Sequence, residues 1–321
     1  MKRTIRQMLL AGISIYFMSI SVFAADRLIP VGKVIGLELH NDTVTVAAFD
    51  DLLTAGREAG LRIGDEILSI DGQTIDSAAD VQQALKYSDG SIELVVDRNG
   101  RECQIHMEPD ITAAGPKMGV FLRQGITGIG TVTFYDPDTG CFGTLGHAVN
   151  DAKGQLLSMT RGSAFPASVI AIDKGKAGKP GQLKGALQSD HLLGSLTTNS
   201  PQGVFGSAPG AWDGEALEVA SYSDIHTGAA SIRSTIDGNG PRDYSVEILK
   251  IYPQAKTDGR NLLIKVTDPT LLAATGGIVQ GMSGSPILQD GKLVGAVTHV
   301  LVNSPDTGYG IFIENMLDAA E

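Results

Sequence analysis

A serine between two glycines stands near the end of the chain, in the run Gly281-Met282-Ser283-Gly284-Ser285-Pro286. Gly281 and Gly284 allow backbone turns that a side chain would block. Such a turn exposes the Ser283 hydroxyl and aims the amide N–H groups of Gly281 and Ser283 into one small space, where they can stabilise an oxyanion. Pro286 fixes φ and suits an exit from the turn into a strand. The run is typical of a nucleophilic serine with its oxyanion hole.

A serine nucleophile needs a base and an acid that orients the base. His147 lies upstream and Asp268 lies between the two, directly before Pro269. The order His, Asp, Ser is one of the known orders of the hydrolytic triad, so His147, Asp268 and Ser283 are the candidate catalytic residues. Asp151 is an alternative acid, in which case Asp268 would only cap the turn before Pro269. A plain β-turn with a buried histidine is the non-catalytic alternative.

His299 is the remaining candidate for chemistry. It could share a metal ion with His147, but two histidines without a clear carboxylate partner make a weak site. We therefore predict that His299 lines the core or the cleft, and that the protein needs no metal and no other cofactor.

The composition limits the function classes. The length of 321 residues allows about two domains, and 40 glycines with little helical periodicity favour short strands joined by tight turns. The net charge of −11, with no basic stripe, argues against a nucleic-acid partner. Cys103 and Cys141 fall in different predicted domains, which favours two separate thiols over a disulfide.

The N-terminus has the pattern of an export signal. Lys2, Arg3 and Arg6 precede an apolar run from Met8 to Phe23, which ends at small residues. We predict that residues 1–25 are a signal peptide or a membrane anchor. Either would carry the rest of the chain across the cytoplasmic membrane, leaving it anchored or secreted.

Residues 30–109 have the pattern of a small β-rich domain. The predicted elements are strands at Val34–Leu39 and Val44–Phe49, a helix from Ser77 to Lys86, and a hairpin of Ile92–Val96 and Glu102–Met107 around Asn99-Gly100. This order resembles a PDZ domain of the bacterial protease type, in which a peptide adds as an extra strand. The resemblance matches the carboxylate-binding amides to Ile35, Gly36 and Leu37. A structural β-domain that binds nothing is the alternative.

Small residues at 110–117 indicate a linker, and the second domain runs from residue 118 to 321. Short apolar segments recur there between glycine, proline and asparagine clusters, which favours a β-sandwich or barrel. A hairpin is expected around Asp290-Gly291, and a short helix at Glu314–Ala320. The fold class expected for the whole chain is mainly β.

Several motifs together resemble the stage IV sporulation protein B family, signalling serine peptidases of spore-forming bacteria. They are Gly128–Pro137, Phe142–His147, Lys174–Lys176, Gln280–Ile287 and Gly308–Phe312. The resemblance extends from about Leu28 to the end. It implies a chymotrypsin-like double β-barrel peptidase domain and favours Asp268 as the acid of the triad. Ser285 stands where that pattern has a second glycine, so we expect it to be structural.

The resemblance also implies a role. Family members are exported from the forespore into the intermembrane space, cut themselves, and cleave a membrane-bound regulator to release processing of a late sporulation sigma factor. The expected partners are therefore a protein substrate, a second copy of the chain in trans, and the membrane through the N-terminal segment. We expect self-cleavage between Ala24 and Val34. The alternatives are a periplasmic-type quality-control protease, which usually carries its PDZ domain after the peptidase, and an inactive PDZ scaffold.

Overall fold

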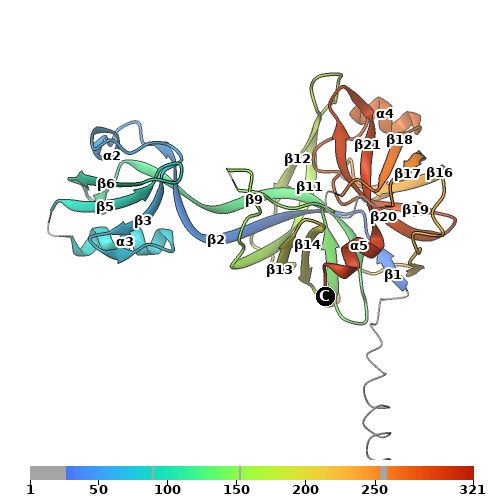
Figure 1. Ribbon diagram of the computed structural model, residues 1–321, viewed down its shortest axis with the longest axis horizontal. Coiled ribbons are helices and arrows are strands. Elements are labelled where there is room, and N and C mark those ends of the chain that lie inside the picture. Colours follow the sequence, from blue (N-terminus) through green and yellow to red (C-terminus); the bar gives the residue numbers. More distant parts are fainter. Residues whose placement is uncertain (1–26, 89, 152, 254–258) are drawn as a thin grey trace, which may run out of the picture.

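The computed structural model describes residues 27–88, 90–151, 153–253 and 259–321. The chain is mainly β, as expected, with a small PDZ-like part standing apart from a larger part built of two barrels (Figure 1). The predicted export segment, residues 1–25, lies outside the described residues. Within the described ranges, none of the helices has the length and apolar character needed to span a bilayer.

The PDZ-like part closes around its own apolar core. Its elements are the end of β2 (Val34–Phe49), α2 (Ala55–Glu58), β3 (Glu66–Ile70), β4 (Gln73–Thr74), α3 (Ala78–Tyr87), β5 (Ile92–Asp97), β6 (Glu102–Met107), β7 (Asp110–Thr112), β8 (Gly115–Lys117) and the start of β9 (Val120–Tyr135). The Ser77 side chain caps α3 by accepting a hydrogen bond from Asp80 N, as expected for an N-cap serine. The predicted hairpin is also present: β5 pairs with β6, and Asn99 and Gly100 both have positive φ.

Six strands close the first barrel in the order β2, β9, β10, β14, β13, β11 and back to β2. The new members are β10 (Cys141–Thr144), β11 (Arg161–Asp173), β13 (Gly194–Ser200) and β14 (Gly203–Ser207). β12 (Gln182–Leu187) extends β11 as an arm. β1 (Arg27–Pro30) pairs with β9 on one side and with β15 (Leu217–Glu218) on the other.

The second barrel is also closed, in the order β16, β17, β18, β21, β20, β19. Its strands and the helices beside it are β16 (Gly228–Ser234), β17 (Arg242–Ile251), β18 (Leu262–Val266), α4 (Pro269–Thr275), β19 (Pro286–Gln289), β20 (Lys292–Leu301), β21 (Ser304–Phe312) and α5 (Ile313–Asp318). The predicted hairpin turn is present between β19 and β20, where Asp290 and Gly291 have positive φ. The predicted terminal helix is α5, which packs into the apolar cluster between the barrels.

The strands β2 and β9 run through both parts of the molecule (Figure 1). Their barrel ends pair from Val34↔Thr131 to Leu39↔Ile126, and their PDZ ends pair from Val44↔Gln124 to Phe49↔Val120. The PDZ-like part is therefore inserted between two strands of the first barrel. This differs from the predicted boundary at residue 30, because the first half of β2 belongs to the barrel.

Two further expectations need correction. Residues 110–117 are not an irregular linker, since they contain the β7–β8 hairpin, which leads directly into β9. The segment expected to be open to self-cleavage is partly a strand: in β1 and after it, Leu28, Ile29 and Val31 are buried. Cleavage at these three residues would need β1 to leave its neighbours, whereas Arg27 and Lys33 are exposed.

A second contact joins the PDZ-like part to the barrels. Lys153 lies on the loop that follows His147, and its ammonium group is 2.9 Å from a carboxylate oxygen of Asp97 and 3.5 Å from one of Glu66. Asp97 ends β5 and Glu66 begins β3, so both acceptors belong to the PDZ-like part. The loop of the candidate base thus has a direct ionic contact with the inserted domain.

Candidate active site

The turn that carries Ser283 lies at the junction of the two barrels. Gly281 and Gly284 have φ values of +96° and +93°, which are the left-handed conformations expected from the motif. Inside the turn, Ser285 N donates to Met282 O at 2.9 Å. Ser285 itself is fully buried and its hydroxyl donates to Ser234 Oγ at 3.0 Å, which agrees with the structural role expected for it.

Threonines of the first barrel hold this turn from the other side. Thr131 N donates to Ser283 O at 3.0 Å, and the Thr131 hydroxyl donates to Gly281 O at 2.8 Å. The Thr133 hydroxyl donates to Gly284 O at 2.7 Å. Both threonines are fully buried on β9. The nucleophile turn of one barrel is therefore positioned by a strand of the other, and that strand continues into the PDZ-like part.

The amides proposed for the oxyanion hole follow the same turn. Among the backbone hydrogen bonds of the described residues, none is donated by Gly281 N or by Ser283 N. The described backbone thus leaves both donors for another acceptor. An oxyanion that accepts from both amides would gain two charge-assisted hydrogen bonds.

His147 follows a tight turn of the first barrel, in which Leu145 and Gly146 both have a φ of 68°. Its Nδ1 lies 2.8 Å from the carbonyl oxygen of Ala148. Because a carbonyl only accepts, Nδ1 carries the proton and Nε2 keeps its lone pair in the neutral ring. This is the tautomer that a general base needs.

Burial lowers the pKa of His147 below its ordinary value of 6.5, and the hydrogen bond to Ala148 O opposes this effect in part. The imidazole is therefore neutral at neutral pH. Protonation would remove the lone pair that accepts the serine proton, so kcat/KM should fall with acidification through a midpoint below pH 6.5. A pH profile on a short peptide substrate checks this. A midpoint clearly above 6.5 would mean that an anionic group supports the His147 cation in the working enzyme.

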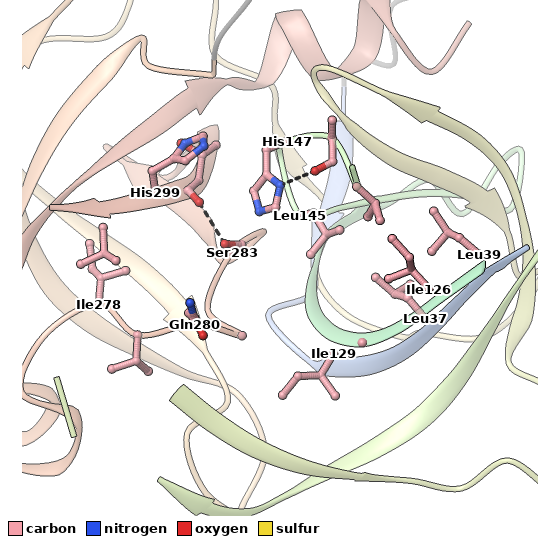
Figure 2. Close-up of a pocket in the computed structure, with 17 residues that line it drawn as sticks. Leu37, Leu39, Ile126, Ile129, Leu145, His147, Ile278, Gln280, Ser283 and His299 are labelled. Atoms are coloured by element: carbon pink, nitrogen blue, oxygen red, sulfur yellow. Dashed lines mark hydrogen bonds between the residues drawn. The ribbon is translucent and has the colours of Figure 1, made fainter. Parts of the chain in front are cut away.

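Ser283 and His147 line one cavity, of about 440 Å³, between the barrels (Figure 2). The Ser283 hydroxyl donates to the Thr298 carbonyl oxygen at 2.9 Å. His299 lies in the same cavity, with its ring 5.4 Å from that of His147. His299 therefore lines the cleft, which is one of the two positions expected for it. Before it attacks a substrate, the Ser283 hydroxyl must rotate so that it donates to His147 in place of the Thr298 carbonyl.

Neither candidate acid is hydrogen-bonded to His147. Asp268 is the N-cap of α4: its carboxylate accepts from Thr270 N and Leu271 N, each at 2.9 Å. Asp151 closes a local turn by accepting from Lys153 N and Gln155 N. The structure thus brings Ser283 and His147 to one cleft and gives Asp268 the capping role that was its alternative. The Ala148 carbonyl supplies the contact that fixes the His147 tautomer.

The capping role predicts a stability effect at Asp268. Asp268→Ala should lower the free energy of unfolding by about 1 kcal/mol, whereas Asp268→Asn should be near wild type because asparagine caps equally well. Urea denaturation measures both. Turnover of the same variants separates the capping role from a catalytic one. An Asp268→Asn protein that has normal stability but no activity would assign the carboxylate a function at His147.

The peptide groove of the PDZ-like part is not where the sequence placed it. Ile35, Gly36 and Leu37 lie in the first barrel, where β2 pairs with β9 on one side and β11 on the other. No edge is left there for an added strand. The correction follows from the continuity of β2, since the two predicted strands are one and only the second half enters the PDZ-like part.

A cavity of about 610 Å³ lies instead between α3 and the PDZ end of β9. Val81 and Leu85 line it from the helix, and Met118 and Val120 line it from the strand and the loop before it. Gly119 in that loop has a φ of +67°. Between Val120 and Gln124, β9 pairs with β2 on one side, and the described residues supply no strand for its other edge. This edge can accept a peptide strand.

Comparison with known proteins finds separate matches for the peptidase region and for the PDZ-like part. The family model described as SpoIVB peptidase S55 matches residues 115–317, which is more than half of the chain, and a PDZ domain model matches residues 54–98. No curated protein matches.

Several solved structures are similar to parts of the chain. The PDZ domain of an SdrC-like protein from Listeria monocytogenes is 21% identical, with 25% of this chain and 87% of that chain covered and a TM-score of 0.23. The active form of the Rv3671c protease from M. tuberculosis is 15% identical, with 61% and 73% covered and a TM-score of 0.37. The HtrA-type protease AlgW with a decapeptide is 13% identical, with 65% and 57% covered and a TM-score of 0.36.

Proposed function

Because the chain belongs to the SpoIVB peptidase S55 family and is a serine endopeptidase, we propose that it is an exported signalling enzyme of limited specificity. In this role it cleaves itself in trans and cleaves a membrane-bound regulator, which releases a late sporulation sigma factor for processing. The observation that carries the proposal is the cleft in which Ser283 and a neutral His147 meet from two barrels.

The proposed reaction uses the groups of that cleft. Ser283 Oγ attacks the substrate carbonyl carbon while His147 Nε2 takes the hydroxyl proton. The amides of Gly281 and Ser283 hydrogen-bond the oxyanion. His147 then gives its proton to the leaving amine, and water hydrolyses the acyl-enzyme by the same steps. Thr131 and Thr133 keep the turn rigid through this sequence, because their hydroxyls hold Gly281 O and Gly284 O.

Limited specificity separates this proposal from a quality-control protease. The purified enzyme should cut a tagged Ser283→Ala copy of the chain at one or a few sites between Ala24 and Val34, and should leave unfolded casein largely intact. N-terminal sequencing of the fragments checks both. Broad degradation of casein at a rate similar to self-cleavage would favour quality control, and absence of any cleavage would favour an inactive scaffold.

The proposed cleavage of a membrane-bound regulator can be tested in the source organism. Loss of the chain should leave one membrane protein uncleaved and block sigma-factor processing, and a Ser283→Ala copy should fail to restore either. Quantitative analysis of membrane-protein fragments during sporulation measures the first effect. Unchanged processing in the mutant would remove the signalling role.

We further propose that the groove between α3 and β9 docks a peptide of the substrate or of a second copy. The exposed Phe121 on β9 supports this, since strand addition there would cover its side chain. Gln82 is exposed on α3 and lines the groove, while Gln83 is exposed on the same helix and does not.

These two glutamines give a matched pair of variants. Gln82→Trp should fill the groove and change the rate of self-cleavage several-fold, and Gln83→Trp should not. Cleavage of a short peptide that does not reach the PDZ-like part should be the same in both. Equal self-cleavage rates in the two variants would leave the PDZ-like part without a docking role.

A further inference from the structure

The cleft around Ser283 and His147 is apolar on both sides. Ile278 lines one side, and Leu37, Leu39 and Ile126 line the other (Figure 2). Two valines lie beside Ile278: Val279 follows it in the chain, and Val300 pairs with Gly308, whose added Cβ would meet Ile278. Among the residues that the structure describes, its lining contains no aspartate, glutamate, lysine or arginine side chain. A charged substrate side chain placed here would lose its hydration without gaining a partner, whereas an apolar one would gain from burial.

The chemistry fixes the direction of the substrate, given the proposed function on which this inference rests. The acyl group that Ser283 takes must direct its oxygen to the amides of Gly281 and Ser283. The leaving nitrogen must lie at His147, which gives it a proton. The residue after the cut therefore lies on the side of Leu37 and Leu39, and the residue before it lies on the side of Ile278 and Val300.

The second of these pockets has a defined base. Val300 on β20 pairs directly with Gly308 on β21. The space above Gly308 is taken by the Ile278 side chain, since a Cβ at that glycine would lie 2.6 Å from Ile278 Cδ1. Ile278 and Val279 are buried, and Val300 is half-buried. Two branched side chains thus limit the depth of the pocket and give it a wholly aliphatic floor.

We propose that Ile278, Val279 and Val300 select an aliphatic side chain immediately before the cleaved bond, while Leu37, Leu39 and Ile126 favour an apolar residue after it. The enzyme thereby acts on apolar stretches of its protein substrates. Gln280, at the edge of the pocket, adds hydrogen-bonding groups without charge.

Peptides that differ at a single position test this. With leucine or valine before the cut, kcat/KM should exceed that with aspartate or lysine by about 100-fold or more. The charged side chain of the substrate would lose its water in the pocket and find no hydrogen-bond partner there. Phenylalanine should be poorer than leucine, because Ile278 and Val300 restrict the depth.

Variants at position 300 assign the preference to this pocket. Val300→Asp should lower cleavage after leucine by at least tenfold and raise cleavage after lysine relative to it, because it supplies a carboxylate at the base. Val302→Asp makes the same chemical change at an exposed valine outside the cleft and should leave the preference unchanged. If Val300→Asp does not fold, Val300→Ala serves instead, and should improve phenylalanine relative to leucine.

The outcomes separate this inference from the proposed function. Cleavage that depends on Ser283 but falls after charged residues, or with no preference, overturns the pocket assignment and leaves the peptidase intact. A preference that Val302→Asp alters as much as Val300→Asp also overturns it. Cleavage that persists in Ser283→Ala overturns the proposed mechanism instead.

Discussion

Replacement of Ser283 by alanine should reduce proteolysis by at least about 10³-fold and leave the fold unchanged. Among the described residues the side chain makes a single hydrogen bond, to the Thr298 carbonyl, so its loss should cost about 1 kcal/mol of stability or less. The second hydroxyl of the turn cannot replace it in the reaction, because Ser285 is buried and hydrogen-bonded to Ser234. The measurement is kcat/KM on a peptide, with urea denaturation to verify folding.

Ser285→Ala is the matched control, since it removes the second hydroxyl of the same turn. It should lose about 1 kcal/mol of stability and keep activity within tenfold of wild type. A fluorophosphonate probe should label Ser283 in this variant and in the wild type. Activity of Ser283→Ala within tenfold of wild type would exclude Ser283 as the nucleophile.

Replacement of Gly284 by alanine should have the largest combined effect on folding and activity. A Cβ at this position would lie 2.0 Å from Thr131 O and 2.5 Å from Leu145 N, and the residue has a φ of +93°. Both neighbours are backbone atoms of the first barrel, which cannot move aside as a flexible side chain can. Overpacking and the strained φ should together lower the free energy of unfolding by about 2–4 kcal/mol.

Activity should fall with it, by about 100-fold or more per folded molecule, because the turn must shift by about an ångström relative to His147. Gly291→Ala is the control: this glycine has a φ of +78° in the β19–β20 turn, and no atom lies within 4 Å of the added Cβ. It should show the cost of φ strain alone, about 1 kcal/mol, with normal turnover. Equal losses in the two variants would mean that the contact with Thr131 is not what the turn requires.

Local patterns predicted the nucleophile turn, the two hairpins and α3, because each depends on residues close in sequence. Gly281 and Gly284 have the positive φ that the motif requires, and Ser77 caps its helix. The His147–Ser283 cleft needed more than local pattern, and the family resemblance supplied it. The double barrel was expected from the same source, and the strand pairings close both rings.

The sequence-based predictions failed where two segments have the same local pattern and only strand pairing with distant residues distinguishes their structures. Gly36 sits in an apolar strand as a PDZ loop glycine would, but it has no positive φ, whereas Gly119 does. Only the pairing of β2 with β9 and β11 distinguishes them. The buried Thr131 and Thr133 were missed for a related reason: on a strand they alternate with apolar residues as solvent-facing threonines do, and their carbonyl partners lie in the other barrel.

The insertion of the PDZ-like part between β2 and β9 has a consequence for how the enzyme is made. During synthesis Val34–Leu39 emerges first and must wait for Gly130 and its neighbours, which follow the whole inserted domain. When that domain folds, it brings the two strands together and removes most of the entropy cost of closing so long a loop. The PDZ-like part thus helps the first barrel to fold by holding β2 and β9 together. A chain shortened to the family-matched region from residue 115 would lack β2, which is a strand of that barrel.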